Sequence, residues 1–277
     1  MPPPSSECPS RASIDVCWVD GALLPTSQAA VRADDSAFQE GRGCYTSVRI
    51  ASGRARFEAR HVERLQRGAK ALRLGDIRAS AIRRALDELA AAALPGGEGV
   101  IRLQLSCDGE GATHLVGIAR GLGVDPAQWT AISVELPQRG GALAGGEKTT
   151  SRAALALAAQ DARAAGADEA LLLDEAGCLI EGARSNLFVA TRDGALCTPP
   201  LSSGAVAGIA RAIALERIAG IAEREIAQSK LLDAAELIAV NSVRGARPIV
   251  RLDGRNVGGG QPGGWSARLA RALESDD

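Results

Sequence analysis

The chain has 277 residues, a formal net charge of −1 and a hydrophobic content of 46%. This length accommodates one large domain or two smaller ones, and the hydrophobic content suffices for a packed core. A nearly neutral chain has no general attraction for nucleic acid or an anionic membrane surface, and no run of 18 uncharged apolar residues is present to span a bilayer.

The chain begins MPPPSSECPSR, which lacks the apolar stretch of a signal peptide, and we expect residues 1–13 to form a disordered tail. Six cysteines are scattered without a C-x-x-C pair, which argues against a zinc cluster and against a dense disulfide framework. We therefore expect a cytoplasmic protein with free thiols and no bound metal.

Residues 14–136 are predicted to form a small N-terminal α/β domain. The segment HVERLQRGAKALRL places apolar residues at helical spacing, with Val62 and Leu65 on the same face. The other predicted elements are two short strands around Asp20-Gly21, a hairpin of YTSVRI and RARFEA, a helix over residues 79–93, and the paired strands VIRLQLSC and THLVGIA.

Residues 137–147 are predicted to be a linker, and residues 148–277 a larger C-terminal domain. Here we expect a helix over SRAALALAAQDARAAG, strands EALLL, CLIE and NLFVA, a helix opening at GIARAIALERI, strands ELIAVN and RPIVRL, and a last helix from about residue 264. Because helices and strands mix without strict alternation, the sequence predicts an α+β protein with two lobes rather than a doubly wound sheet.

The loop GALAGGEKTT, residues 141–150, is close to a phosphate-binding P-loop but departs from the pattern G-x-x-x-x-G-K-[ST]. Glu147 stands between Gly146 and Lys148, where it would place a carboxylate in the phosphate cradle. The later segment ALLLDEAGCLIEG reads as a hairpin with a turn at DEAG, which does not suit the acidic strand of a nucleotidase. A P-loop nucleotidase is therefore only a remote alternative.

Lysine is rare in this chain and occurs only at Lys70, Lys148 and Lys230, among 32 Lys and Arg residues. Under such a bias, a lysine needed only for its charge can drift to arginine. A lysine needed as an amine cannot, because a guanidinium stays protonated and forms no Schiff base. Lys148 lies in the glycine-rich loop and is the candidate amine.

A Schiff base between Lys148 and pyridoxal 5'-phosphate requires a carboxylate near the pyridine nitrogen and groups that bind the phosphate. Glu181 ends an apolar strand in CLIEGARSNLF, and Gly208 in AVAGIAR precedes helix amides that can receive a phosphate. Arg64 could add a positive charge and Ser242 a hydroxyl. Each residue also has a purely structural explanation, so the hypothesis rests on their joint presence.

As a set, these segments resemble the class IV, or fold-type IV, pyridoxal-phosphate enzymes. The family includes branched-chain aminotransferases, D-amino acid aminotransferases and 4-amino-4-deoxychorismate lyases. The resemblance covers roughly residues 17–275 and rests on HVERL, EKTTSR, ADEALLLDEAGCLIEGARSNLF, VAGIAR and NSVRGARPIVRLDG. It implies a two-lobed fold, with a small N-terminal and a larger C-terminal α/β domain, the cofactor between them, and a homodimer.

The resemblance also implies roles for individual residues. Lys148 matches the Schiff-base lysine and Glu181 the partner of the pyridine nitrogen. The residues that match the phosphate site are Arg64, Ile209 and Ala210 through their amides, and Ser242 through its hydroxyl. Family members often have threonine where Ala210 stands, so one hydroxyl contact is missing from the expected set.

Three further residues are candidates for binding substrate. EGRGCYTSVRI, together with Arg152 four residues after Lys148, is most similar to the lyases. Tyr45 matches a tyrosine that faces the substrate carboxylate in D-amino acid aminotransferases, with a core aromatic as the alternative. His114 could replace the arginine that family members tend to carry after the strand VIRLQLSC, with a surface hairpin histidine as the alternative.

We predict a 4-amino-4-deoxychorismate lyase that yields 4-aminobenzoate and pyruvate for folate biosynthesis. The alternative is an aminotransferase of the D-amino acid or branched-chain type. In both reactions Lys148 removes a proton from the carbon that bears the substrate nitrogen, so the motifs do not separate them. A non-catalytic family member is a remote alternative, against which the retention of Lys148, Glu181 and Arg64 argues. The expected partner is a small amine or amino acid, and no nucleic acid or membrane is expected.

Overall fold

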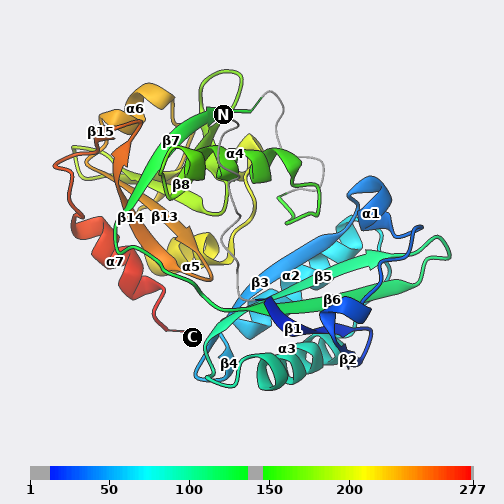
Figure 1. Cartoon of the computed structure of the whole chain (residues 1–277). Coiled ribbons are helices and arrows are strands. Elements are labelled where there is room, and N and C mark those ends of the chain that lie inside the picture. Colours follow the sequence, from blue (N-terminus) through cyan, green and yellow to red (C-terminus); the bar gives the residue numbers. More distant parts are fainter. Residues whose placement is uncertain (1–12, 137–145, 276–277) are drawn as a thin grey trace, which may run out of the picture.

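The computed structural model describes residues 13–136 and 146–275, and it shows two lobes, each built on its own β-sheet (Figure 1). In the N-terminal lobe, six strands form one antiparallel sheet in the order β2-β1-β6-β5-β3-β4. The elements of this lobe are β1 (Ser13–Val19), β2 (Ala22–Leu24), a 3-10 helix (Thr26–Gln28), α1 (Ser36–Glu40), β3 (Cys44–Ala51), β4 (Arg54–Ala55), α2 (Glu58–Ala71), α3 (Ala79–Ala93), β5 (Gly99–Cys107) and β6 (Thr113–Arg120).

The alternation of side chains in β5 explains how this lobe is assembled. Ile101, Leu103 and Leu105 are fully buried and belong to one core cluster with residues of α2 and α3. Because side chains alternate between the two faces of a strand, Arg102 and Gln104 lie on the opposite face of the sheet. That face is less apolar and contributes to the candidate site described below.

In the C-terminal lobe, the strands form a mixed sheet in the order β12-β11-β10-β13-β14-β7-β8-β9, with β15 paired to β14. Helices α5 and α7 pack on β13 and β14, and α4 packs on β7 and β8. The elements are β7 (Trp129–Glu135), α4 (Ala153–Ala164), β8 (Glu169–Leu173), β9 (Leu179–Gly182), β10 (Asn186–Ala190), β11 (Leu196–Thr198), a 3-10 helix (Leu201–Ser203), α5 (Ile209–Arg217), β12 (Ala222–Glu223), α6 (Gln228–Leu232), β13 (Glu236–Asn241), β14 (Gly245–Leu252), β15 (Arg255–Asn256) and α7 (Gly264–Ala272).

The predicted α+β class with two lobes is confirmed, but the boundary between the lobes differs from the prediction. Strand β7 falls inside the predicted N-terminal domain of residues 14–136, yet it pairs in parallel with β8 and β14 of the second sheet. A parallel partner is distant in sequence, so the local pattern gave no sign of this pairing. The first sheet ends at Arg120. Residues 137–145 of the predicted linker and residues 1–12 of the predicted tail lie outside the described residues.

Several contacts join the two lobes. Arg60 in α2 forms two hydrogen bonds of 2.8 and 2.6 Å with the Glu216 carboxylate in α5. The Ser242 hydroxyl, just after β13, donates to the carbonyl of Ser47 in β3 at 3.3 Å. Among the helices that the structure describes, none is long and apolar enough to cross a membrane.

Candidate active site

Lys148 lies where the two lobes meet. The amide of Tyr45 donates to the Lys148 carbonyl at 2.9 Å, and the amide of Thr150 donates to the Gly43 carbonyl at 2.8 Å, which aligns the lysine segment along the start of β3. On its other side, Gly146 accepts a hydrogen bond of 2.8 Å from the amide of Ala207 in the C-terminal lobe. The lysine is therefore carried by a segment that both lobes hold.

The surroundings of the Lys148 amine favour its neutral form. Burial, followed by the nearby charges of Arg64 and Arg152, lowers the pKa of Lys148 to about 7, against the opposing effect of the Glu181 carboxylate. An amine with this pKa is neutral in an appreciable fraction of molecules near pH 7. Lys148 can therefore act as a nucleophile and as a base without a large change of pH.

Glu181 is a buried carboxylate at the end of β9, 6% exposed. Its Oε2 accepts hydrogen bonds from the amide of Val206 at 3.0 Å and from Nδ2 of Asn186 at 3.3 Å. Burial raises the pKa of Glu181 to about 7, opposed by the Val206 hydrogen bond and the charge of Lys148. Two fixed donors hold the carboxylate in one orientation, so it can face a basic nitrogen.

Arg64 and the start of α5 form an electropositive corner beside Lys148. Arg64 is buried, and its Nη2 donates to the carbonyl of Ala207 at 2.7 Å. Gly208 is the N-cap of α5, and no side chain caps the helix. A Cβ on Gly208 would lie 1.8 Å from Oδ1 of Asn186, so any other residue there would displace the Asn186 side chain. The first amides of α5, at Ile209 and Ala210, have no side-chain cap and follow shortly after Ala207, which binds Arg64. Uncapped helix amides beside an arginine are suited to binding an anion.

Tyr45 and two arginines lie near the Lys148 amine. The Lys148 Nζ lies 4.9 Å from the centroid of the Tyr45 ring, and the guanidinium carbons of Arg102 and Arg152 lie at 3.8 and 5.2 Å. Among the described residues, the buried Tyr45 hydroxyl and the buried Nε of Arg152 have no hydrogen-bond partner. Buried polar groups without partners in a cationic surrounding are suited to an anionic ligand.

Arg102, which lies over the Tyr45 ring, was not among the candidate residues predicted from the sequence. It is in β5, where its neighbour across the pair with β3 is Ser47, so it lies on the same face of the sheet as Tyr45. By the family resemblance, the substrate arginine would follow this strand, and His114 was the predicted replacement for it in this chain. The signal was the alternation in VIRLQL, which places Arg102 and Gln104 on the face opposite to three buried apolar residues.

The structure does not bring His114 and Lys148 into contact. The Nδ1 of His114 lies 2.7 Å from Oδ2 of Asp20, and its Nε2 lies 3.3 Å from Oδ2 of Asp108. The Asp20 hydrogen bond, reinforced by Asp108, raises the pKa of His114. This histidine joins the hairpin of β5 and β6 to the end of β1, so its predicted role in binding substrate finds no support in its contacts. Ser242 is likewise placed at the junction of the lobes by its bond to Ser47, without a described contact to Arg64.

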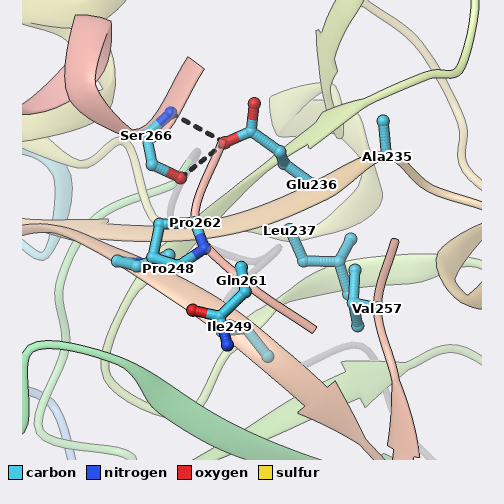
Figure 2. A pocket seen from close by; sticks show the side chains of 9 residues that line it. All are labelled: Ala235, Glu236, Leu237, Pro248, Ile249, Val257, Gln261, Pro262 and Ser266. Carbon is cyan, nitrogen blue, oxygen red and sulfur yellow. Dashed lines mark hydrogen bonds between the residues drawn. The ribbon is translucent and has the colours of Figure 1, made fainter. Parts of the chain in front are cut away.

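A hollow lies between β13, β14 and the loop before α7, and none of the candidate site residues lines it (Figure 2). Its charged residue, Glu236, accepts hydrogen bonds from the amides of Gly263, Trp265 and Ser266 and from the Ser266 hydroxyl. These bonds satisfy the free amides at the start of α7, so Glu236 is a helix cap. This hollow is structural and is not a competing active site.

The donor set around Lys148 fits pyridoxal phosphate. The cofactor needs an amine, a carboxylate for its ring nitrogen and an anion site for its phosphate, and Lys148, Glu181 and the corner of Arg64 and α5 supply these groups. The absence of a Cβ at Gly208 leaves room for the Asn186 side chain that binds Glu181. Described groups of His, Cys, Asp and Glu contain no set that could hold a metal ion.

Comparison with known proteins identifies a family for this chain. The model of the family described as amino-transferase class IV matches residues 43–252. Branched-chain-amino-acid aminotransferase-like protein 2 of Arabidopsis thaliana is 25% identical over 307 residues, covering 99% of this chain and 52% of that protein. The branched-chain-amino-acid aminotransferase of Pseudomonas aeruginosa is 32% identical over 120 residues, 42% of this chain and 38% of that protein. The chain thus spans about half or less of these relatives.

Solved structures share the whole fold. A branched-chain aminotransferase from Thermoproteus uzoniensis with norvaline superposes with a TM-score of 0.81 at 26% identity, covering 93% of both chains. A hypothetical aminotransferase from Mycobacterium tuberculosis in a PLP-bound form has a TM-score of 0.81 at 23% identity, covering 94% of this chain and 98% of that one. Class IV aminotransferases use pyridoxal phosphate. The family match extends over most of the chain and includes Lys148 and Glu181, so the chain belongs to the class IV aminotransferase family.

Proposed function

We propose that this protein is a pyridoxal-phosphate-dependent aminotransferase that moves an amino group from an amino acid to a 2-keto acid. The observation that carries the proposal is that Lys148 is buried near the Glu181 carboxylate and the Arg64 guanidinium, whose charges act on its amine. The relatives reported above are named aminotransferases, which favours transamination over the lyase reaction that sequence analysis preferred.

Lys148, Glu181, Arg64 and the amides of Ile209 and Ala210 would hold the cofactor. When bound, pyridoxal phosphate supplies an electron sink for the pair of electrons left on the substrate carbon when its proton is removed. Glu181 would keep a proton on the ring nitrogen, because its carboxylate is oriented by Val206 and Asn186. Arg64 and the start of α5 would neutralise the phosphate charge.

Lys148 moves the proton. Its Nζ accepts a proton in the neutral form and returns it in the charged form, and a pKa of about 7 makes both forms accessible near neutral pH. Transamination would require Lys148 to give this proton back, and a 2-keto acid would then be needed to accept the amino group. In a lyase a carbon fragment leaves instead. The lysine serves either outcome, so the substrate decides between them.

Arg102, Arg152 and the Tyr45 hydroxyl are our candidates for binding the substrate carboxylate. Both guanidiniums lie close to the Tyr45 ring, and the Tyr45 hydroxyl and the Arg152 Nε lack partners among the described residues. Amino acids and 2-keto acids both carry a carboxylate beside the reacting carbon. One cationic pocket can therefore orient the substrates of both halves of the reaction.

Turnover with and without an acceptor tests the proposal. We expect conversion of a branched-chain or D-amino acid only when a 2-keto acid is present, and a single half-reaction without it. Lys148→Arg is the matched control, because it keeps the charge but cannot form an imine. Sustained release of 4-aminobenzoate and pyruvate from 4-amino-4-deoxychorismate, with no keto acid added, would instead establish the lyase.

A further inference from the structure

The ion pair between Arg67 and Glu147 is a feature that neither the phosphate site nor the substrate site uses. Glu147, the residue that interrupts the P-loop pattern, is 4% exposed and lies directly before Lys148. Arg67 Nε donates to its Oε1, and Nη2 lies 3.4 Å from Oε2. The Arg67 side chain is half exposed, so this pair joins a surface residue to a buried carboxylate.

Arg67 belongs to the same helix as Arg64. Residues three apart in a helix lie on neighbouring parts of one face, so α2 directs both guanidiniums towards the junction of the lobes. The helix comes close to the lysine segment at Gly68, where a Cβ would lie 2.9 Å from Sγ of Cys44 and 3.6 Å from Oε2 of Glu147. Glycine at this position permits the approach.

The contacts form a closed circuit. Arg64 of α2 donates to the carbonyl of Ala207, and the amide of Ala207 donates to the carbonyl of Gly146. The next residue, Glu147, binds Arg67, which returns the circuit to α2. Three links therefore fix the helix, the loop before α5 and the lysine segment relative to one another, and the Arg67–Glu147 pair is the only ionic link of the three.

We propose that Arg67 and Glu147 are positioning residues, which keep the Lys148 amine at a fixed separation from the Arg64 corner. The proposal rests on the proposed function. A cofactor held at both its aldehyde and its phosphate gains affinity only if the two anchors are correctly spaced, because the second contact is then made at high effective concentration. Loss of the Arg67–Glu147 pair would loosen the spacing between Lys148 and the Arg64 corner but would leave both of these groups in place.

The test separates the two anchors in the apoprotein. Pyridoxal, which lacks the phosphate, reports on Lys148 alone after borohydride trapping and peptide mapping. Inorganic phosphate, measured by competition, reports on the Arg64 corner alone. Pyridoxal phosphate reports on both together. The variants are Arg67→Gln and Glu147→Gln. The matched control is Arg83→Gln, which removes an arginine of α3 that is paired at 2.7 Å with Glu58, at the opposite end of α2 from Arg67.

We expect both variants to bind pyridoxal and phosphate separately as the unaltered protein does. We expect their affinity for pyridoxal phosphate to fall about ten- to a hundredfold, the cost of a small misplacement between two anchors. Arg67→Lys should restore part of the loss, since it keeps the charge without the fork geometry. The Arg83→Gln control should bind all three probes normally.

Unchanged affinity for pyridoxal phosphate in Arg67→Gln overturns the proposal, as does an equal loss in the Arg83→Gln control. Glu147 is buried and its variant can fail to fold, so the half-exposed Arg67 carries the decision. If the unaltered protein forms no adduct on Lys148 with pyridoxal phosphate, the proposed function fails and the positioning role fails with it. If the unaltered protein forms the adduct on Lys148 and the variants bind pyridoxal phosphate with the same affinity, the positioning role alone is refuted.

Discussion

The guanidinium of Arg102 is stacked on the ring of Tyr45, with its carbon 3.8 Å from the ring centroid. The two residues come from neighbouring strands, β5 and β3, and lie on the same face of the sheet. Burial lowers the pKa of Arg102, with the positive charge of Arg152 adding to the effect. An arginine stacked in this way is fixed in position before any substrate arrives, so its charge is available to a carboxylate at little cost in entropy.

Arg102→Gln should therefore raise the KM for amino acid substrates more than it lowers kcat. Loss of one hydrogen bond to a charged group costs about 1.5–3 kcal/mol, which corresponds to roughly ten- to a hundredfold in KM. An amine substrate without a carboxylate should be insensitive to the change. Arg49→Gln on β3 is the control, because Arg49 is paired with Glu98. Equal losses for the amino acid and the amine would remove Arg102 from carboxylate binding.

Tyr45→Phe should separate stability from function. The Tyr45 hydroxyl is buried and has no partner among the described residues, and such a group costs about 1–3 kcal/mol when it is left unsatisfied. We expect the apoprotein of the variant to be at least as stable as the unaltered protein in thermal unfolding. Substrate KM should rise, because the hydroxyl is no longer present to meet the carboxylate. A destabilised variant with normal KM would show that Tyr45 is only a core residue.

Gly208→Ala should damage the phosphate corner and the pyridine partner together. The new Cβ would lie 1.8 Å from Oδ1 of Asn186, whose Nδ2 donates to Glu181 and to the carbonyl of Val206. Displacing Asn186 should cost about 1–3 kcal/mol of stability, as overpacking does, and should weaken cofactor binding. Gly264→Ala is the control, since nothing lies within 4 Å of its Cβ position. Normal cofactor binding in Gly208→Ala would contradict the close approach.

Sequence patterns were informative wherever the constraint is local. The hairpin predicted for ALLLDEAGCLIEG is confirmed by the antiparallel pairing of β8 and β9, which places Leu172 opposite Glu181. The last helix begins at Gly264, as predicted. In both cases turn residues and apolar spacing lie within one short window. The cofactor and the family also followed from short motifs around Lys148 and Glu181, and the family match confirms them.

Sequence patterns gave wrong or incomplete predictions where contacts between distant segments determine the position of a strand or side chain. Strand β7 joins the second sheet through parallel partners about 40 and 120 residues further along the chain, which no local window contains. Arg102 lies beside Tyr45 through the pairing of β3 with β5, two strands about 50 residues apart in sequence, so no local window contains both residues. His114 was assigned by its position after a strand, but the carboxylates of Asp20 and Asp108 that hold it lie on different loops.

The reactivity of Lys148 should depend on pH with a midpoint near 7, compared with about 10.4 for a lysine in an unfolded chain. Labelling of the apoprotein with an amine reagent, followed by peptide mapping, measures this midpoint. Arg152 lowers the pKa of Lys148 and Glu181 raises it, so Arg152→Gln should shift the midpoint up and Glu181→Gln should shift it down. A midpoint near 10 in the unaltered protein would refute the neutral amine, and shifts of the opposite sign would refute the assigned contacts.

His114 should stabilise the N-terminal lobe at acidic pH and leave catalysis unaffected. Its hydrogen bonds to Asp20 and Asp108 raise its pKa above the value of about 6.5 in an unfolded chain. The folded state therefore binds the proton more tightly, and this stability is fully present below about pH 6.5 and is lost as pH rises through the folded pKa. His114→Gln should lower Tm at pH 5.5 and change it far less at pH 8.5, with KM for the amino acid unchanged. A rise in KM without the pH-dependent loss of Tm would instead support the substrate-binding role that sequence analysis assigned to this histidine.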